Sequence, residues 1–123
     1  MAKRVLLIED NPTDAAIVKE HLIEEGIEVD VAQTGKSGLE KTRETKPDLV
    51  ILDILLPDMS GFEVCSKLKK EISLKKTIIV ILSVKDSIDD IKKGFAAEAD
   101  DYIIKPPEPH FLVRKIKLYL GMR

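Results

Sequence analysis

The amino-acid sequence predicts an α/β fold of five strand–helix repeats, (βα)5, with a doubly wound parallel sheet between two layers of helices. Two observations predict this class. Short apolar runs alternate along the chain with longer segments whose apolar residues recur at helical spacing. Several of the runs are apolar on both faces, as strands are when helices cover the sheet on each side. Alternating strands and helices are typical of parallel sheets, whose connections cross over with one hand.

Each predicted strand is a short run that ends at a polar, charged or turn-forming residue. The second run alternates in polarity, which is typical of an edge strand. The first, third and fourth runs are apolar throughout, which is typical of strands buried on both faces. In chain order the five runs are residues 5–8, 29–32, 49–52, 77–82 and 102–104.

Helix signals follow each of these runs. Asn11 and Pro12 are typical of a helix cap and a first turn, and Ser60 with Glu63 forms a capping-box pattern. Pro109 is expected in the first turn of the last helix, with Glu108 as a poor cap. The apolar stripes of the five helices run through residues 12–25, 34–44, 60–68, 87–97 and 111–120.

Length and composition favour one ordinary domain over residues 1–123. Apolar residues make up 44% and charged residues 34% of the chain, which is typical of a globular domain. The longest apolar run, Ile78–Leu82, is far shorter than the roughly 20 residues of a membrane span, and the first residues lack a signal-peptide pattern. The single cysteine, Cys65, excludes an internal disulfide, so the cytoplasm is the expected location. A net charge of −2 with no Trp does not favour nucleic-acid binding.

Polar residues end or directly follow four of the predicted strands: Glu9 and Asp10, Asp53, Ser83 and Lys105. In a parallel sheet these strand ends lie at one edge, where open α/β folds bind ligands. Clustered carboxylates repel one another unless a cation lies among them, and oxygen ligands of this kind suit Mg²⁺. The lysine can pair with a carboxylate or neutralise an incoming anion. The pattern therefore predicts Mg²⁺-assisted phosphoryl transfer with a carboxylate as the nucleophile.

Four motifs in chain order resemble the receiver domain of bacterial two-component response regulators. Residues 7–11 have the sequence Leu-Ile-Glu-Asp-Asn, and residues 53–57 have Asp-Ile-Leu-Leu-Pro, followed by Gly61. Ser83 ends the fourth apolar run, and residues 101–106 are Asp-Tyr-Ile-Ile-Lys-Pro. The resemblance covers nearly the whole chain. It implies a flavodoxin-like sheet with strand order 2-1-3-4-5, which the apolar pattern alone leaves open.

The resemblance also implies a role for each site residue. Asp53 is the expected phosphoacceptor, and a histidine kinase or a phosphotransfer protein is the expected phosphodonor. The chain is then expected to assist its own phosphorylation and dephosphorylation rather than to act as an enzyme on a separate substrate. Ser83 and Lys105 are expected to contact the phosphoryl group, and Tyr102 to change rotamer when Ser83 moves. The Lys105–Pro106 bond is expected to be cis. The expected Mg²⁺ site is formed by Asp10, which binds the ion directly, by Asp53, by the backbone carbonyl of Leu55 and by Glu9, which acts mainly through water.

The surface formed by the fourth helix, the fifth strand and the last helix is the expected site of a homodimer or an output partner. No direct contact of this domain with nucleic acid or membrane is expected. The sequence is consistent both with a single-domain regulator and with a fragment of a longer regulator.

Some positions depart from the family pattern. Glu98 stands where many receivers have glycine, which predicts a different loop shape before the fifth strand. Val84 follows the switch hydroxyl, where a smaller residue is usual, and is expected to narrow access to the site. Leu55 and Lys85 occupy the two positions that flank the hydrolytic water in the family. Neither side chain can accept a proton at pH 7, so a long-lived phosphorylated state is expected.

Two other functions fit parts of the pattern. A phosphohydrolase of the haloacid dehalogenase type also uses an aspartate nucleophile and Mg²⁺, but it needs an acid two residues later, where this chain has Leu55. A pseudo-receiver that only binds partners would be expected to lack an acid or the lysine, and this chain retains all of them.

Overall fold

The computed structural model describes residues 2–123 and contains one five-stranded parallel sheet with the order β2-β1-β3-β4-β5. Both the predicted fold class and the strand order implied by the resemblance are confirmed. The strands are β1 (Arg4–Ile8), β2 (Glu28–Ala32), β3 (Leu49–Leu52), β4 (Ile78–Ser83) and β5 (Asp101–Ile104). The helices are α1 (Pro12–Ile23), α2 (Gly35–Thr45), α3 (Gly61–Lys70), α4 (Ile88–Ala96) and α5 (Pro109–Tyr119), with a 3₁₀ turn, η1, at Ile72–Leu74.

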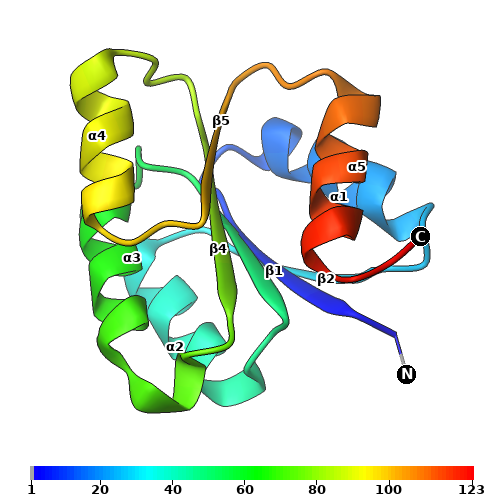
Figure 1. Cartoon of the computed structure of the whole chain (residues 1–123), viewed down its shortest axis with the longest axis horizontal. Helices are drawn as coiled ribbons and strands as arrows, with labels where there is room; N and C mark the ends of the chain where they lie inside the picture. The colour runs from blue at the N-terminus through cyan, green and yellow to red at the C-terminus, as the bar shows by residue number, and fades with distance from the viewer. Residues whose placement is uncertain (1) are drawn as a thin grey trace.

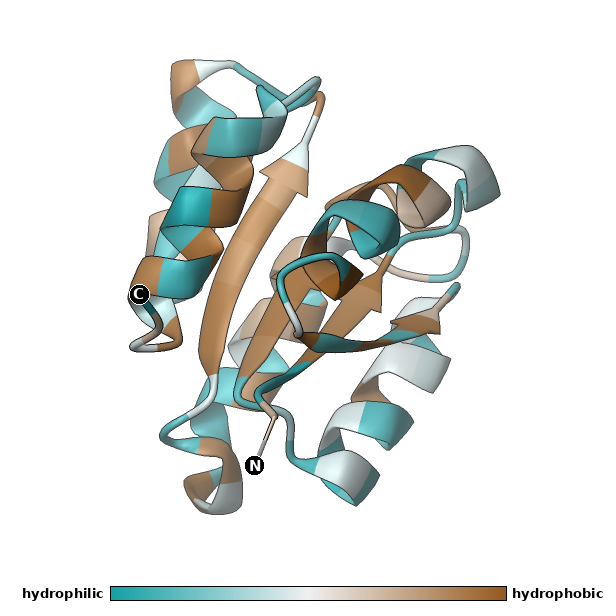
Figure 2. Ribbon diagram, turned by 90° about the vertical axis from the view of Figure 1, so that its right-hand side faces the viewer, coloured by the Kyte–Doolittle hydropathy of each residue, from teal (hydrophilic) through white to brown (hydrophobic). Residues whose placement is uncertain are grey.

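The sheet lies between two helical layers. Helices α1 and α5 cover one face, and α2, α3 and α4 cover the other (Figure 1). The strands alternate their side chains between two separate cores, so that Leu7 and Ile51 belong to the α1–α5 side, whereas Leu6 and Val50 belong to the opposite side. Figure 2 shows central strands that are hydrophobic along most of their length, between helices of mixed hydropathy, whereas the edge strand β2 carries the polar residues Glu28 and Asp30. The central strands thus have the pattern expected of strands buried on both faces.

Helix caps follow the sequence closely, with two corrections. The prediction that Glu108 caps α5 poorly is wrong, because its carboxylate accepts hydrogen bonds from the backbone N–H groups of His110 (3.1 Å) and Phe111 (2.7 Å). These bonds hold the pKa of Glu108 below its usual value. Ser60 does cap α3, accepting from the N–H of Phe62, but the capping box forms at α2, between Thr34 and Ser37.

The loop before β5 corrects a third expectation. Glu98 adopts the left-handed conformation, with φ +70°, although it carries a side chain. This conformation lets the N–H of Glu98 bond to the carbonyl of Phe95 and the N–H of Ala99 bond to that of Gly94. The two bonds form a Schellman motif that closes α4. The loop therefore has the conformation that glycine would supply, at a cost of about 1 kcal/mol.

The strand register aligns the carboxyl ends of the strands at one edge. Ile8 pairs with Leu52, Leu52 with Ile81, and Ile81 with Tyr102, so these residues form one row across the sheet. The residues that follow this row share the edge at which α/β folds bind ligands. None of the helices within residues 2–123 is both long enough and apolar enough to cross a membrane.

Candidate functional site

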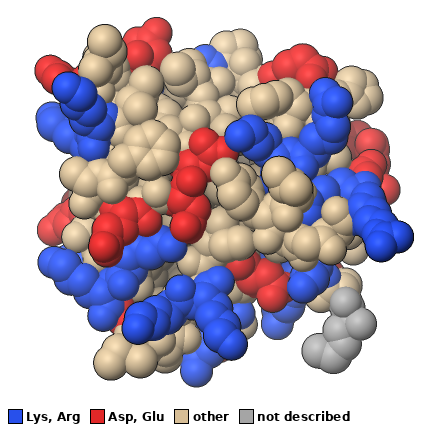
Figure 3. Space-filling model, in the orientation of Figure 1, with Lys and Arg blue, Asp and Glu red and all other residues tan. Residues whose placement is uncertain are grey.

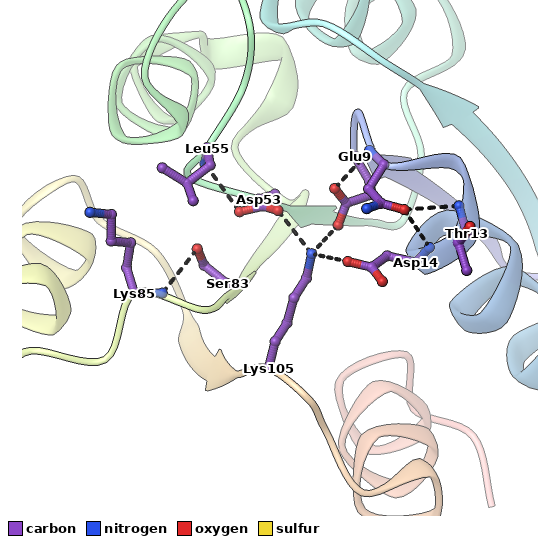
Figure 4. Close-up of polar contacts among 9 residues, drawn as sticks. Glu9, Thr13, Asp14, Asp53, Leu55, Ser83, Lys85 and Lys105 are labelled. Carbon is purple, nitrogen blue, oxygen red and sulfur yellow. Dashed lines mark hydrogen bonds and ion pairs between the residues drawn. The ribbon is translucent and has the colours of Figure 1, made fainter.

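The site lies at the carboxyl edge of the sheet and is built by four strands. Glu9 follows β1, Asp53 follows β3, Ser83 ends β4 and Lys105 follows β5. Figure 4 shows Lys105 extending from the end of β5 toward carboxylates that come from the ends of β1 and β3 and from α1. These four residues therefore lie at one edge of the sheet, as their positions at the strand ends predict.

The ammonium of Lys105 is the centre of this cluster. It donates to Glu9, to Asp53 Oδ2 at 2.9 Å and to Asp14 Oδ2 at 3.1 Å. An ammonium has three donors, so the three carboxylates use all of them. Only 10% of the Lys105 side chain is exposed. Burial alone lowers the pKa of Lys105, but the three carboxylates outweigh burial and raise it well above its usual value.

Glu9 is buried deeper than the other carboxylates. Its side chain is 3% exposed, and burial raises its pKa in spite of the hydrogen bonds from Lys105 and from the N–H of Asn11. Every buried side-chain nitrogen or oxygen among residues 2–123 has a hydrogen-bond partner. The buried polar atoms of the cluster are therefore all paired, and three carboxylates share the one ammonium.

Three of these acids form a group that fits a divalent cation. Glu9, Asp10 and Asp53 each offer a carboxylate oxygen, and these atoms lie within 4.8 Å of one another. Asp10 is exposed, whereas Glu9 and Asp53 are buried, so the group is open on one side. A donor set of oxygens only, with an open side for water, suits Mg²⁺. The acids of this structure therefore fit the metal that the resemblance implies.

The loop after β3 holds Asp53 in place from two directions. The N–H of Leu55 donates to Asp53 Oδ1 at 3.1 Å. Gly61, at the start of α3, packs so closely on this loop that a Cβ there would overlap the backbone oxygen of Asp53. Asp58 ties the loop to α2 by accepting from the N–H groups of Gly35 (2.7 Å) and Lys36 (2.9 Å). The backbone carbonyl of Leu55 stays a predicted metal ligand.

Ser83 and Tyr102 lie on neighbouring strands beside the site. Ser83 is fully buried, and its hydroxyl accepts from the N–H of Lys85 at 3.4 Å. The half-buried ring of Tyr102 lies against Gly94 of α4, and its hydroxyl donates to the carbonyl of Lys85 at 2.6 Å. Lys85 thus contacts both residues through its backbone, although the proposed switch itself stays a prediction.

Sequence reasoning missed one member of the cluster. Asp14 lies in the first turn of α1, where an acid is usual because it stabilises the helix dipole. Its contact with Lys105 depends on how the lysine side chain is directed, which no sequence pattern reports. The Lys105–Pro106 peptide bond is cis, as the resemblance implies.

Comparison with known proteins identifies the family. Residues 5–117 match the response regulator receiver domain. DNA-binding response regulator MtrA of Mycolicibacterium smegmatis is 36% identical over 120 residues, which are 98% of this chain and 51% of that protein. The chain therefore spans about half the length of the curated relatives it matches.

Solved structures agree with this match. A CheY-like receiver domain protein of Methanospirillum hungatei superposes with a TM-score of 0.92 at 33% identity, covering 98% of this chain and 95% of that one. The BeF3-activated N-terminal receiver domain of Klebsiella pneumoniae RstA gives a TM-score of 0.90 at 30% identity, covering 96% and 98% of the two chains. Since the sequence match reaches all five strands and the sheet has the strand order of these domains, the chain belongs to the family of response regulator receiver domains of two-component systems.

Proposed function

We propose that the chain is a phosphoacceptor that receives a phosphoryl group on Asp53 from a histidine kinase or a phosphotransfer protein. One observation carries the proposal. The Asp53 carboxylate lies within one cation-sized group of acids and also accepts from the ammonium of Lys105. A phosphoryl donor carries negative charge, so it can approach these carboxylates only if that charge is offset. A cation in the acid group and the ammonium of Lys105 would each offset it.

In the proposed transfer, one oxygen of the Asp53 carboxylate attacks the phosphorus atom of the donor. The oxygen that attacks the phosphorus forms a new P–O bond, while the bond from phosphorus to the donor breaks and the donor keeps that electron pair. Glu9, Asp10 and Asp53 would hold the Mg²⁺ ion, which would supply positive charge to offset the charge of the phosphoryl group. The N–H of Leu55 steadies Oδ1 of Asp53, and Lys105 moves its ammonium from the carboxylates to a phosphoryl oxygen.

The haloacid dehalogenase alternative finds no support at the site. Leu55 stands two residues after Asp53, and its half-exposed side chain has no group that can exchange a proton. The acids and the lysine that a phosphorylated receiver needs are all present, so no feature of the site favours a pseudo-receiver.

The signal is proposed to leave the site through Ser83 and Tyr102. A phosphoryl group adds three acceptor oxygens, and the hydroxyl of Ser83, which accepts in its contact with Lys85, is expected to turn and donate its hydrogen to one of them. Tyr102 shares Lys85 as a partner, so its ring is expected to change its packing against α4. Ser83 and Tyr102, each with two arrangements, would then connect the phosphorylation site to the surface at α4.

The proposed output surface is formed by α4, β5 and α5. It exposes apolar side chains on each of its three elements, among them Ile88 (72%), Phe95 (49%), Ile104 (42%) and Phe111 (44%). Figure 3 shows this face with acidic and basic side chains interspersed among uncharged surface. Such a mixture suits a second copy or an output partner rather than a nucleic acid, which prefers a uniformly basic surface.

The phosphodonor is proposed to dock on the other side of the site. An apolar pocket of about 270 Å³ lies between α1 and the loop that follows Lys105, and its lining includes Ile17, Val84 and Pro106. This pocket is lined in part by Lys105, whose ammonium contacts Asp53, so a partner seated there is expected to present its phosphoryl group to the site.

Incubation with acetyl phosphate tests the proposed function. With Mg²⁺ the intact mass of the protein is expected to rise by one phosphoryl group, and EDTA or Asp53→Asn is expected to abolish the increase. Asp30→Asn is a matched control, because Asp30 is an exposed aspartate of β2 outside the acid group. Labelling of Asp53→Asn at the wild-type level would refute the assignment.

A further inference from the structure

Asp14 differs from the other carboxylates that contact Lys105. Glu9 and Asp53 belong to the group of acids that fits a cation, and Asp14 does not. Its Oδ2 lies 3.1 Å from the ammonium, and its side chain is 42% exposed, whereas those of Glu9 and Asp53 are 3% and 7% exposed. Lys105 is therefore held by two buried acids of the metal group and by one half-exposed acid outside it.

The oxygens of Glu9 and Asp53 have competing uses. Each residue gives one oxygen to Lys105 and the other to a backbone N–H, that of Asn11 or that of Leu55. A cation bound by Glu9 and Asp53 would therefore compete with the ammonium of Lys105 for their carboxylate oxygens. Asp14, by contrast, makes no ion pair other than that with Lys105 among residues 2–123.

The position of Asp14 is fixed by the start of α1. Asn11 caps the helix by accepting from the N–H groups of Thr13 (2.9 Å) and Asp14 (3.0 Å). The cap sets the direction of the first turn, and this turn presents the Asp14 carboxylate to Lys105 (Figure 4). A rigid helix end therefore holds the third partner of the ammonium.

We propose that Asp14 is a positioning residue that retains the Lys105 ammonium on the α1 side of the site while Glu9 and Asp53 are engaged by Mg²⁺. Without Asp14, Lys105 has only the acids of the metal group as partners, and it competes more strongly with Mg²⁺ for their oxygens. The inference rests on the proposed function, since it gives Asp14 a part in preparing the same site.

Mg²⁺ affinity, measured by isothermal titration calorimetry on the unphosphorylated protein, tests this role. Asp14→Asn is expected to weaken Mg²⁺ binding about two- to fivefold, the range for a partly exposed ion pair. In a Lys105→Met background the same substitution is expected to change the affinity less than about twofold, because the competitor is gone. Asp86→Asn, which removes an exposed acid without a contact to Lys105, is the matched control and is expected to bind Mg²⁺ like the wild type.

Asp14→Glu supplies a second comparison if Lys105→Met does not fold. The longer carboxylate has room at this half-exposed position and is expected to restore most of the affinity lost in Asp14→Asn. Equal weakening by Asp14→Asn in both backgrounds, or no weakening in the wild type, overturns the role of Asp14 while the metal site stands. A wild-type protein that binds no Mg²⁺ contradicts the proposed function itself, so the two failures are distinguishable.

Discussion

At the scale of single residues, Leu55 and Lys85 occupy the two positions expected to flank a hydrolytic water near Asp53, the proposed phosphoacceptor. Leu55 is 46% exposed beside Asp53, and it contributes a backbone N–H but no polar side-chain atom to the site. Lys85 contacts Ser83 and Tyr102 through its backbone, and its ammonium can donate but not accept. Neither residue can orient a water molecule for attack by accepting its proton.

The phosphorylated state is therefore expected to decay slowly. Leu55→Asn and Lys85→Glu each introduce an acceptor and are expected to speed the loss of phosphate at least about tenfold, because positioning or base assistance is typically worth about 10²–10⁴ in rate. The decay of the phosphorylated mass in Mg²⁺ after removal of the donor measures this. Leu55→Ala, which removes bulk without adding an acceptor, should change the rate less. If both acceptor variants decay like the wild type, these positions do not set the lifetime.

At the scale of secondary structure, the C-terminus of α4 places Glu98, a residue with a side chain, in the left-handed conformation that glycine usually adopts. Glu98 occupies the left-handed conformation because the Schellman bonds to Phe95 and Gly94 require it there. A side chain in this conformation costs about 1 kcal/mol, and glycine avoids the cost.

Glu98→Gly is thus expected to stabilise the protein by about 1 kcal/mol, in spite of the added entropy of the unfolded chain. Urea unfolding measures the change. Glu98→Ala keeps the Cβ atom and is expected to leave the stability within a few tenths of a kcal/mol. A loss of stability in the glycine variant would contradict the strain assigned to Glu98.

The junction of β5 and α5 depends on one carboxylate. Burial raises the pKa of Asp101, but hydrogen bonds from the Tyr119 hydroxyl, the Tyr102 N–H and the Lys115 ammonium outweigh it and lower the pKa below the usual value. Burial, together with the hydrogen bond to Asp101, raises the pKa of Tyr119 to about 12. The ionised carboxylate is therefore the form that the folded protein favours.

Asp101→Asn is expected to lower the free energy of unfolding by about 1–2 kcal/mol at pH 7. Since the pKa of Asp101 is lower in the folded than in the unfolded chain, its contribution is complete above the unfolded value, near about 4. The contribution is lost as the pH falls through the folded value. The difference between wild type and variant should therefore shrink in acid, as urea titrations at several pH values will show. A difference independent of pH would contradict the role of the charge.

The elements and most of the site were predictable from the sequence, for identifiable reasons. Apolar runs mark buried strands, and residues at the ends of parallel strands share an edge, so Glu9, Asp53 and Lys105 could be placed together. Strand order came only from the family resemblance, because periodicity reports burial and not neighbours. Asp14 and the cap made by Glu108 were missed, because each depends on where a flexible side chain reaches.

At the scale of the whole molecule, the helices are anchored unequally. Of the residues of α4 only Gly94 is buried, and the helix contacts the sheet there through the ring of Tyr102. Helix α2, by contrast, buries four residues. An element with few buried contacts is the one most easily displaced, so α4 is the part of the fold best able to respond to a change at Asp53.

We expect a phosphoryl group on Asp53 to act on α4 through Ser83 and Tyr102, and backbone amide chemical shifts measure this effect. Adding beryllofluoride, a phosphoryl mimic, to the Mg²⁺-bound protein is expected to shift the amides of Ser83, Tyr102 and Gly94 and those along α4. In Ser83→Ala the shifts should stay close to Asp53. Shifts confined to the acid group in the wild type, with Tyr102 and α4 unchanged, would show that the phosphoryl mimic does not act on α4 through Tyr102.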